Sequence, residues 1–376
     1  MTDLPTTNLT MLTEVKAGGT LDLYLAALPM AAPRDHEVVV KVQATPINPS
    51  DLGLMIGGAD PSSVRAGERD GQPSLTMDVP PPGMRAMAGR MDEALPIGNE
   101  GCGIVVAAGA SPEAQALMGK TVALIGGSIY AEYRTLPSAM CMLLPDETAP
   151  ADGASCFVNP LTSLGFTETM KMEGYAGIIH AAAASNLGQM LVKICKADGI
   201  PLINIVRSQA QVDLLKGIGA DIVLDSSSDT FMPDLTAAIV ETGIFLGFDP
   251  IGGGKVSSQI LSCMEAAAVK RMSAYSRYGS DQMKQVYIYG GLDMGPTILN
   301  RSFGLTWGLG GWLLTPFMAK AGPEIVGRMR KRVVDELTTT FKSHYSHEIS
   351  LADAVKADVM TAYNAKRTGE KYLIRP

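Results

Sequence analysis

Residues 180–207, HAAAASNLGQMLVKICKADGIPLINIVR, have the pattern of a strand, a tight turn, a helix and a second strand. The turn reads Ala182-x-x-Ser185-x-x-Gly188, which is similar to a dinucleotide-binding turn whose central glycine is missing. Small side chains allow backbone N–H groups and the helix N-terminus to face a pyrophosphate. Gly188 keeps glycine where the helix packs on the strand. The stretch therefore predicts a nucleotide-binding strand–helix–strand unit.

Arg207 ends this stretch at the position that selects between the two nicotinamide cofactors. An acidic residue about 20 residues after the turn usually binds the ribose 2′-hydroxyl of NAD. Here the position holds Arg207, followed by Ser208, and a guanidinium can pair with a phosphate dianion through its fork of N–H donors. The sequence therefore favours NADPH over NADH. A solvated arginine at a strand end is the alternative.

Strand and helix patterns alternate from about Tyr175 onward. Strands are predicted at AGIIHA, PLINIV, ADIVLD, IFLGFD and QVYIYG, and helices at residues 186–197, 209–217, 233–242 and 257–269. Such alternation requires right-handed crossovers and predicts a parallel, doubly wound sheet. Two glycine clusters, residues 248–254 and 289–293, each follow a predicted strand at the carboxyl edge of this sheet. They favour contacts with the nicotinamide, and simple turns are the alternative.

The preceding residues contain short runs interrupted by glycine and proline, which predict a small, irregular β-barrel-like domain over roughly the first 150 residues. Residues 56–96 are the least regular segment and predict a long loop, either on the surface or as a lid over the active site. The C-terminal segment predicts an amphipathic helix at residues 323–342 and a terminal strand, EKYLIRP, that joins the first domain.

The composition of the 376-residue chain indicates which kinds of partner it binds. A net charge of −7 and a pI near 5.2 provide no basic surface for a nucleic acid. Charged residues make up only 18% of the chain and hydrophobic residues 46%, which favours an oligomer. The nearly uncharged run at 303–319 is shorter than the about 20 residues of a membrane-spanning helix, so a buried crossing or a subunit contact is expected there.

The N-terminus and the cysteines indicate a cytoplasmic location. The start, MTDLPTTNLTMLTE, has neither the basic nor the apolar region of a secretory signal. The five cysteines are far apart and lie mostly in apolar patterns. Buried reduced thiols are therefore expected, rather than disulfides or a metal cage.

Motifs occur along nearly the whole chain. They are INPSD (47–51), PIGNEGCGIVVAAG (96–109), GGSIYAEY (126–133), LPDETAPADGA (144–154), NPLTS (159–163) and GIGADIVLD (217–225). As a set they resemble the medium-chain dehydrogenase/reductase superfamily, in its zinc-free quinone oxidoreductase branch. The pieces INPSD, VNPLTS and INIVR are particularly similar to mitochondrial-type enoyl thioester reductases.

The resemblance implies an α/β fold with two domains. Residues 1–155, completed by residues 317–376, would form a GroES-like, β-rich catalytic domain. Residues 156–316 would form a doubly wound Rossmann domain that binds NADPH. The apolar run around Trp307 and Trp312 falls where relatives pair subunits through an edge strand, which implies a homodimer.

The resemblance also implies site residues. Asn48 and Thr162 would contact the nicotinamide and its ribose, and they would act as positioning residues. The other cofactor contacts would be Ser185, Asn186 and Leu187 at the pyrophosphate, Arg207 and Ser226 at the adenosine phosphate, Tyr289, Gly291 and Leu292 beside the nicotinamide ring, and Lys371 from the C-terminal segment.

Zinc is not expected. Zinc alcohol dehydrogenases, which this chain resembles as members of the superfamily, carry the sequence GHE where this chain has GNE at residues 98–100. They also carry a zinc-ligand cysteine where this chain has residues 48–51. The chain has no cysteine cluster with the spacing of a structural zinc site. The usual Lewis acid for alcohol oxidation is therefore not predicted.

The sequence shows no obvious proton donor. Enoyl thioester reductases carry a tyrosine shortly after INPSD, and the corresponding text here, LGLMIGGADPSS, has none. Tyr130 and Tyr133 fit a structural role better than a catalytic one. The four histidines offer no convincing acid, and His180 is expected to pack in a core strand. They are His36, His180, His344 and His347.

These observations predict an enzyme that transfers hydride from NADPH to a quinone or a similar electron-poor small-molecule acceptor. A quinone suits a site without a clear donor, because water can protonate the weakly basic reduced oxygen. One alternative is C=C reduction in an enone or acyl thioester, with a CoA ester held by basic residues of the long loop, namely Arg65, Arg69, Arg85 and Arg90. A different alternative is a non-catalytic NADPH-binding sensor or structural protein, since fold does not fix function.

Overall fold

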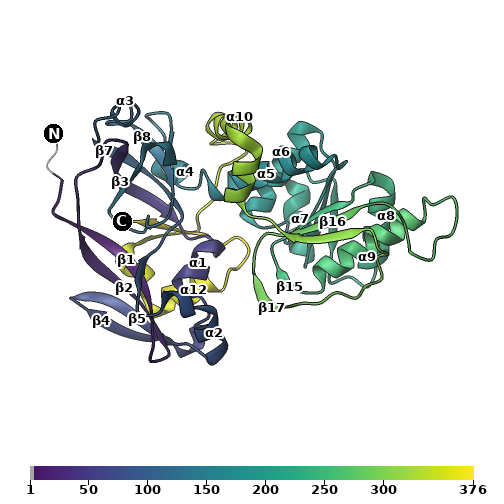
Figure 1. The fold of residues 1–376 in the computed structure, drawn as a ribbon, viewed down its shortest axis with the longest axis horizontal. Coiled ribbons are helices and arrows are strands. Elements are labelled where there is room, and N and C mark those ends of the chain that lie inside the picture. The colour runs from purple at the N-terminus through teal and green to yellow at the C-terminus, as the bar shows by residue number, and fades with distance from the viewer. Residues whose placement is uncertain (1–3) are drawn as a thin grey trace. The chain divides into compact units, whose positions relative to one another are not determined.

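The computed structural model describes residues 4–376, which form two compact units (Figure 1). The first unit combines the residues up to Val158 with Val334–Pro376, and the second consists of Asn159–Val333. The sequence places the boundaries after residues 155 and 316. The second unit continues further than this because helix α10 (Leu314–Asp335) packs within it, for example through the ion pair between Arg332 and Asp198.

The first sheet of the first unit is antiparallel, with the strand order β4-β5-β2-β1-β6. Leu21, Leu23 and Leu25 alternate along β2 and are buried in one apolar core, as the two-residue period of a half-buried strand requires. The strands are β1 (Thr7–Lys16), β2 (Thr20–Pro29), β4 (Arg65–Arg69), β5 (Gln72–Asp78) and β6 (Ala94–Pro96).

Residues 56–96 do not form one long loop, and that prediction was wrong. Asp70 and Gly71 join β4 to β5 with φ values of 53° and 75°, as a two-residue hairpin turn requires. The prolines and glycines here separate short paired elements, and β5 extends the first sheet beside β2. The β4–β5 hairpin therefore forms an edge of the first sheet. The other elements are η1 (Pro61–Ser63), α2 (Pro81–Ala86) and η2 (Ala88–Arg90), where η denotes a 3-10 helix.

The second sheet of the first unit includes the C-terminal strand. β20 (Tyr372–Arg375) pairs antiparallel with β3 (Glu37–Pro46), with Leu373 opposite Pro46. The prediction that the terminal strand joins the first domain is confirmed. The remaining strands are β7 (Glu100–Ala108), β8 (Thr121–Ile125), β9 (Tyr133–Pro137), β10 (Cys141–Leu143) and β19 (His347–Ser350). The helices are α1 (Pro49–Met55), α3 (Pro112–Gln115), η3 (Ser138–Met140), α4 (Pro150–Gly153), α11 (Leu351–Ala354) and α12 (Ala357–Asn364).

The second unit contains a six-stranded parallel sheet with the order β13-β12-β11-β14-β16-β18. Counted within this sheet, the order is 3-2-1-4-5-6, the arrangement of a dinucleotide-binding Rossmann fold. The doubly wound prediction is confirmed. The strands are β11 (Ile178–His180), β12 (Leu202–Val206), β13 (Ile222–Asp225), β14 (Leu246–Asp249), β16 (Lys284–Ile288) and β18 (Trp307–Gly311), and a separate pair is β15 (Gly252–Gly254) with β17 (Asp293–Thr297).

Helices cover both faces of this parallel sheet (Figure 1). One apolar core contains residues of α5 (Val158–Glu173), α6 (Asn186–Asp198) and α7 (Gln209–Gly217). A second core contains residues of α8 (Phe231–Thr242) and α9 (Val256–Val269). The four helices predicted between the strands agree with α6 to α9 to within two residues at each end.

Helix α10 differs from the helix predicted at residues 323–342. It begins earlier, at Leu314, and ends at Asp335. Gly322 interrupts it with φ 82° and ψ 168°, directly before Pro323. The predicted start therefore corresponds to the beginning of its second half, because a glycine in this conformation followed by proline breaks the helix.

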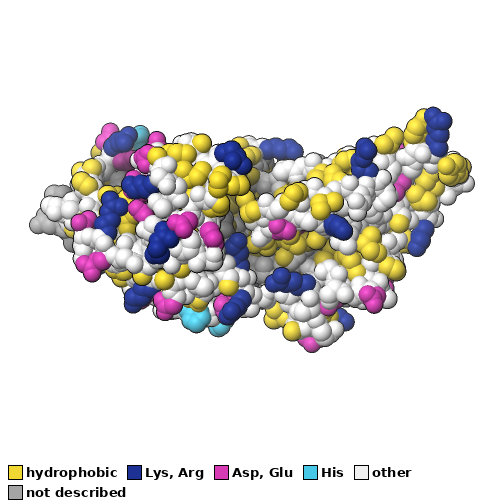
Figure 2. Space-filling view, turned by 90° about the horizontal axis from the view of Figure 1, so that it is seen from below, with side chains coloured by type: hydrophobic (Ala, Val, Ile, Leu, Met, Phe, Trp, Pro, Cys, Tyr) yellow, Lys and Arg dark blue, Asp and Glu magenta, His cyan; other side chains and the backbone are white. Residues whose placement is uncertain are grey.

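Charged side chains of both signs are interspersed with apolar ones on the face shown in Figure 2. All five cysteines are free and buried, which confirms the expected thiols. Among residues 4–376, no helix is long and apolar enough to cross a membrane.

Candidate active site

Glu100 is the centre of a buried hydrogen-bond network in the first unit. It opens β7 and has no exposed surface. Its Oε1 accepts hydrogen bonds from Asn48 Nδ2 (2.8 Å) and Ser155 Oγ (3.2 Å). Its Oε2 accepts from the backbone N–H groups of Phe157 and Val158, each over 2.9 Å. Four donors satisfy a carboxylate that burial alone would destabilise.

Asn48 is fixed by this network immediately before α1. Its backbone N–H donates to Asp51 Oδ2 over 2.8 Å, and its side-chain amide donates to Glu100. Its carbonyl oxygen Oδ1 is buried and accepts no hydrogen bond from residues 4–376. Asn48 also lines a pocket of about 40 Å³ together with Leu52, Tyr363 and Lys371. The side chain is therefore held in place at the wall of this pocket.

Asp51 lies in the first turn of α1 and is 2% exposed. Burial raises the pKa of its carboxyl to about 7, although the backbone N–H groups of Asn48 and Asn99 favour the ionised form. Desolvation therefore outweighs the local donors. Asp51 is not among the predicted site residues, although an acidic residue three positions after an N-cap asparagine is a recognisable helix-start pattern.

Lys371 joins the same network from the segment before β20. Its Nζ donates to Ser155 Oγ over 2.8 Å and to Ser343 Oγ over 3.4 Å, and it lies 5.3 Å from the centre of the Tyr345 ring. Burial lowers the pKa of Lys371 to about 8, while the charges of Glu100 and Asp51 oppose this shift. A lysine in this range can hold or release a proton near neutral pH.

The small-residue turn of the second unit leads from β11 into helix α6. Ser185 caps α6, since its hydroxyl accepts a hydrogen bond from the Gly188 N–H over 3.1 Å. A Cβ atom on Gly188 would lie 2.1 Å from the carbonyl oxygen of Ala183, so only glycine fits this approach. Asn186 and Leu187 are the first two residues of α6, and their N–H groups belong to the helix end that favours anions.

Arg207 and Ser226 lie at neighbouring strand ends. Val206 is in register with Asp225, and the Ser226 N–H donates to the Val206 carbonyl over 2.8 Å. The Arg207 backbone N–H donates to Gln211 Oε1 over 3.0 Å, and its side chain is exposed at the end of β12. An exposed arginine and a serine at the ends of neighbouring strands are residue types that can bind a phosphate group.

The two glycine clusters are brought together, because β15 pairs with β17 and Gly252 is in register with Asp293. Tyr289 and Gly291 lie in the turn after β16, and the Leu292 N–H donates to the Pro250 carbonyl over 3.1 Å. This turn is at the carboxyl edge of the parallel sheet, where ligands of such folds bind.

His180 is confirmed as a core residue. It has no exposed surface, and its Nε2 lies 2.7 Å from Tyr289 Oη. Burial lowers its pKa to about 3, so the imidazole is neutral. The hydroxyl of Tyr289 is therefore held by a buried core residue.

Two further residues considered from the sequence, Thr162 and Tyr130, are buried. Thr162 lies on α5 and is 7% exposed. Tyr130 is buried, and its hydroxyl donates to the Pro46 carbonyl over 2.9 Å, which supports a structural role. Among residues 4–376, no group of three or more His, Cys, Asp or Glu side chains is placed to hold a metal ion.

Most arginines considered for a CoA ester have partners in the first unit. Arg65 pairs with Asp78 over 2.7 Å, and Arg69 stacks 3.8 Å above the ring of Tyr24. Arg90 donates to the Leu54 carbonyl near the end of α1 over 2.8 Å. Arg85 is exposed on α2. These contacts favour structural roles for the first three.

No protein-family model matches the chain. Prostaglandin reductase-3 of Mus musculus is 25% identical over 226 residues, which is 60% of this chain and 52% of that protein. Mitochondrial enoyl-[acyl-carrier-protein] reductase of Xenopus tropicalis is 27% identical over 210 residues, 54% of this chain and 51% of that protein. The chain thus spans about half the length of these curated relatives.

Solved structures match over the whole length. A Mesorhizobium loti protein assigned as a NADPH:quinone reductase has a TM-score of 0.75 and 25% identity, with all of both chains covered. Quinone oxidoreductase of Escherichia coli, complexed with NADPH, has a TM-score of 0.68 and 18% identity, covering 98% of this chain and 100% of that one.

These matches define the fold as that of the medium-chain dehydrogenase/reductase superfamily, with a GroES-like unit and a Rossmann unit. The relatives and structural neighbours are quinone oxidoreductases and enoyl reductases, which are enzymes.

Proposed function

We propose that the protein is an NADPH-dependent oxidoreductase that reduces an electron-poor small-molecule acceptor without zinc. The observation that carries the proposal lies at the carboxyl edge of the parallel sheet. There the small-residue turn follows β11 and Arg207 follows β12, and these two strands are neighbours. Structural neighbours were solved with NADPH, including quinone oxidoreductase of Escherichia coli.

The residues at this edge fit NADPH. Ser185, Asn186 and Leu187 would bind the pyrophosphate, and Arg207 with Ser226 would bind the adenosine phosphate. At the other end of the cofactor, Tyr289, Gly291, Leu292 and Thr162 would hold the nicotinamide and its ribose. Asn48, the N-cap residue of α1, would also contact the nicotinamide. When bound, NADPH supplies a hydride from its nicotinamide C4.

We propose Lys371 as the proton donor that the sequence did not reveal, in addition to its expected place near the cofactor. Its ammonium is held by Ser155, and the Asn48 side chain shares the same Glu100 carboxylate. With a pKa of about 8, Lys371 is largely protonated at neutral pH and can give a proton to the reduced acceptor. Ser155 and Glu100 are then positioning residues.

A quinone is the favoured acceptor, since structural neighbours include quinone oxidoreductases. Reduction of a C=C bond in an enone or acyl thioester is the second candidate. The specific observation in its favour is Lys371, because carbon protonation requires a positioned acid. Relatives named as prostaglandin and enoyl reductases are consistent with this chemistry.

The test is NADPH oxidation by the full chain against a benzoquinone, a naphthoquinone, an alkenone and crotonyl-CoA, with NADH in parallel. Turnover with quinones supports the favoured acceptor, and turnover only with the alkenone or crotonyl-CoA supports the second candidate. NADPH binding without turnover of any acceptor would instead indicate the non-catalytic sensor.

We further propose a homodimer in a reducing, cytoplasmic compartment. β18 ends the parallel sheet, so its outer edge offers backbone groups for pairing. Leu305 and Leu313, on either side of it, are 72% and 65% exposed. Five buried thiols suit a reducing compartment. Light scattering should give twice the chain mass of 39.6 kDa, and Leu305→Glu with Leu313→Glu should reduce it to the monomer.

A further inference from the structure

A chain of hydrogen bonds joins Asp51 to Lys371 inside the first unit. Asp51 Oδ2 accepts from the Asn48 backbone N–H over 2.8 Å, and the Asn48 Nδ2 donates to Glu100 Oε1 over 2.8 Å. Ser155 Oγ donates to the same Glu100 oxygen over 3.2 Å and accepts from Lys371 Nζ over 2.8 Å. One continuous chain of contacts therefore has a titratable group at each end.

Asp51, Glu100 and Lys371 form a buried charge cluster, which we call the Asp51 cluster. Asp51 is 2% exposed, Glu100 has no exposed surface, and Lys371 is half-buried. When all three groups are ionised, two negative charges face a single positive one. Charges in such a poorly solvated region interact more strongly than in water. The protonation of each group therefore depends on the charge of the others.

The other titratable groups beside the cluster are mainly phenols and a thiol. Tyr130 lies next to Asp51, and burial raises the pKa of its hydroxyl well above the usual value. Cys156 and Tyr345 lie near Lys371, and burial raises the pKa of both. The phenols and the thiol thus keep their protons near neutral pH, whereas the pKa values of Asp51 and Lys371 are about 7 and about 8. The small pocket beside the cluster is also lined by Tyr363, Lys366 and Glu370.

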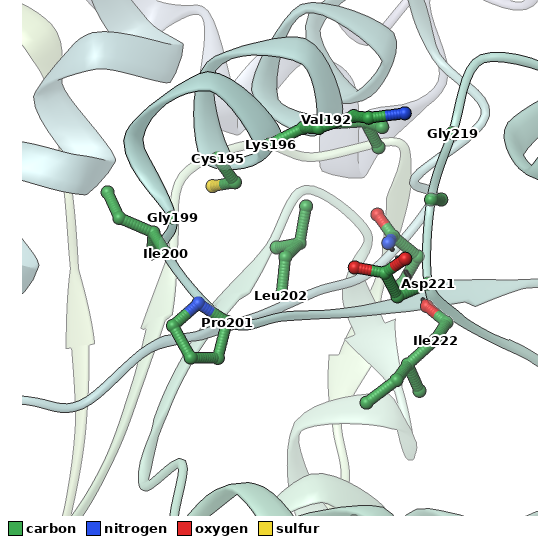
Figure 3. A pocket seen from close by; sticks show the side chains of 12 residues that line it. Val192, Cys195, Lys196, Gly199, Ile200, Pro201, Leu202, Gly219, Asp221 and Ile222 are labelled. Atoms are coloured by element: carbon green, nitrogen blue, oxygen red, sulfur yellow. Dashed lines mark hydrogen bonds between the residues drawn. The ribbon is translucent and has the colours of Figure 1, made fainter.

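The cavity of the second unit has a different character. It has a volume of about 330 Å³ and lies between the end of α6 and the starts of β12 and β13 (Figure 3). Lys196 and Asp221 at its wall are exposed, and Asn204 is a neutral amide. The lining residues described there include no buried carboxylate or amine, so the coupled protons are those of the first unit.

We propose that Asp51 is a positioning residue of the proposed reaction and that its negative charge keeps the proton on Lys371. This inference rests on the proposed role of Lys371 as proton donor. When Lys371 gives its proton to the reduced acceptor, its amine becomes neutral and the carboxylates lose their counter-charge, until water returns a proton to the amine. An ionised Asp51 makes this loss less favourable. The backbone N–H groups of Asn48 and Asn99 both donate to Asp51, which therefore also holds α1 beside the start of β7.

The first measurement is an NMR titration between pH 6 and 10 of the full-length protein carrying ¹³C at the lysine Cε atoms. The Lys371 signal is identified by its absence from the Lys371→Met spectrum. Asp51→Asn keeps the size of the side chain and removes its charge, so the titration midpoint of Lys371 should fall by about 0.5–1 in pH. Asp60→Asn is the matched control, because Asp60 also caps a helix in this unit but is exposed. It should leave the midpoint unchanged.

The kinetic measurement separates charge from structure. In steady-state assays of the proposed reaction, the alkaline limb of kcat should move to lower pH in Asp51→Asn by the same amount as the NMR midpoint. Asp51→Glu restores the charge and should return the limb towards its wild-type position. A merely structural role of Asp51 would lower activity without moving the limb.

Two results would overturn the proposal. One is a Lys371 midpoint that Asp51→Asn leaves unchanged, and the other is an equal fall of the midpoint in Asp60→Asn. The NMR titration needs neither NADPH nor turnover. A lowered midpoint in a protein that reduces no acceptor would therefore support the coupling of Asp51 with Lys371 and refute the proposed function instead.

Discussion

Lys371 Nζ donates a hydrogen bond to Ser155 Oγ over 2.8 Å, although 216 positions separate the two residues in the chain. This contact joins the C-terminal segment to the Glu100 carboxylate, which Ser155 and Asn48 share. Lys371 therefore lies in the same unit as Asn48, and both residues line the same small pocket.

Replacing Lys371 with methionine should lower kcat by about 100-fold or more, the usual contribution of a general acid. The wild-type rate should fall as pH rises through about 8, because the protonated amine is the active form. The variant should lose this dependence. Steady-state rates between pH 6 and 10 provide the measurement.

Lys371→Arg is the matched control for this prediction, because arginine keeps the positive charge and does not release a proton in this range. An arginine variant with full activity and an unchanged pH profile would contradict proton donation and leave an electrostatic role.

Arg207→Ala should raise the KM for NADPH by about 10- to 100-fold, since a charged hydrogen-bonded pair is lost. The KM for NADH should change little, because NADH has no phosphate at this position. Lys216→Ala on the neighbouring helix α7 should leave both values unchanged. Equal losses for the two cofactors would refute the phosphate assignment.

Gly188→Ala should destabilise the protein by about 1–3 kcal/mol and weaken NADPH binding, because the new methyl group meets the Ala183 carbonyl oxygen at 2.1 Å. Gly217→Ala is the control: no atom lies within 4 Å of its added Cβ, so its stability should be equal or slightly higher. Urea unfolding distinguishes the two. Identical midpoints would show that the turn relaxes without cost.

Lys284→Met should cost about 3–5 kcal/mol of unfolding free energy, because it leaves a buried carboxylate without its counter-charge. Lys284 has no exposed surface, and its Nζ lies 2.6 Å from Glu265 Oε2. The double variant with Glu265→Gln should be less destabilised than the sum of the single changes. Exposed Lys270→Met should have little effect. Strict additivity in urea unfolding would exclude coupling of the pair.

Asp51 should make stability depend on pH. Its folded pKa of about 7 is above the unfolded value of 3.8, so the folded state binds more protons between these limits. The unfolding free energy should therefore fall by a few kcal/mol as pH rises from about 4 to 7. Asp51→Asn should flatten this slope. Parallel stability curves for the two proteins would show that Asp51 ionises normally.

Much of the second unit could be predicted from the sequence, because its helices and strands are marked by residues next to them in the chain. The helix α6 pattern ends at Gly199, which adopts φ 65°, and α8 ends at Gly243, which adopts φ 71°. Such C-terminal glycines mark helix ends within a few residues of sequence. Arg207 and Ser226 lie at neighbouring strand ends, because parallel strands bring their carboxyl ends to one edge of the sheet.

The rest depends on contacts between distant residues. The sequence around the Asp70 hairpin contains prolines, which are unfavourable in most strands, so its strands were not predicted. The pairing of β5 with β2 joins distant residues and has no local sequence pattern. Glu100, Ser155 and Lys371 come from three separated segments, so no spacing in the sequence connects them. The unpartnered Oδ1 of Asn204 has no sequence signal, because a polar residue within an apolar strand shows its contacts only in three dimensions.

The pairing of β20 with β3 has a consequence for synthesis on the ribosome. Because β20 follows the whole second unit in the chain, β3 leaves the ribosome long before its partner strand exists. At typical elongation rates of about 5–20 residues per second, translating Asn159–Val333 takes roughly 10–35 s. Throughout that interval the edge of β3 around Thr45 and Pro46 is open in the nascent polypeptide, and this is when a chaperone would be needed to prevent strand-to-strand aggregation.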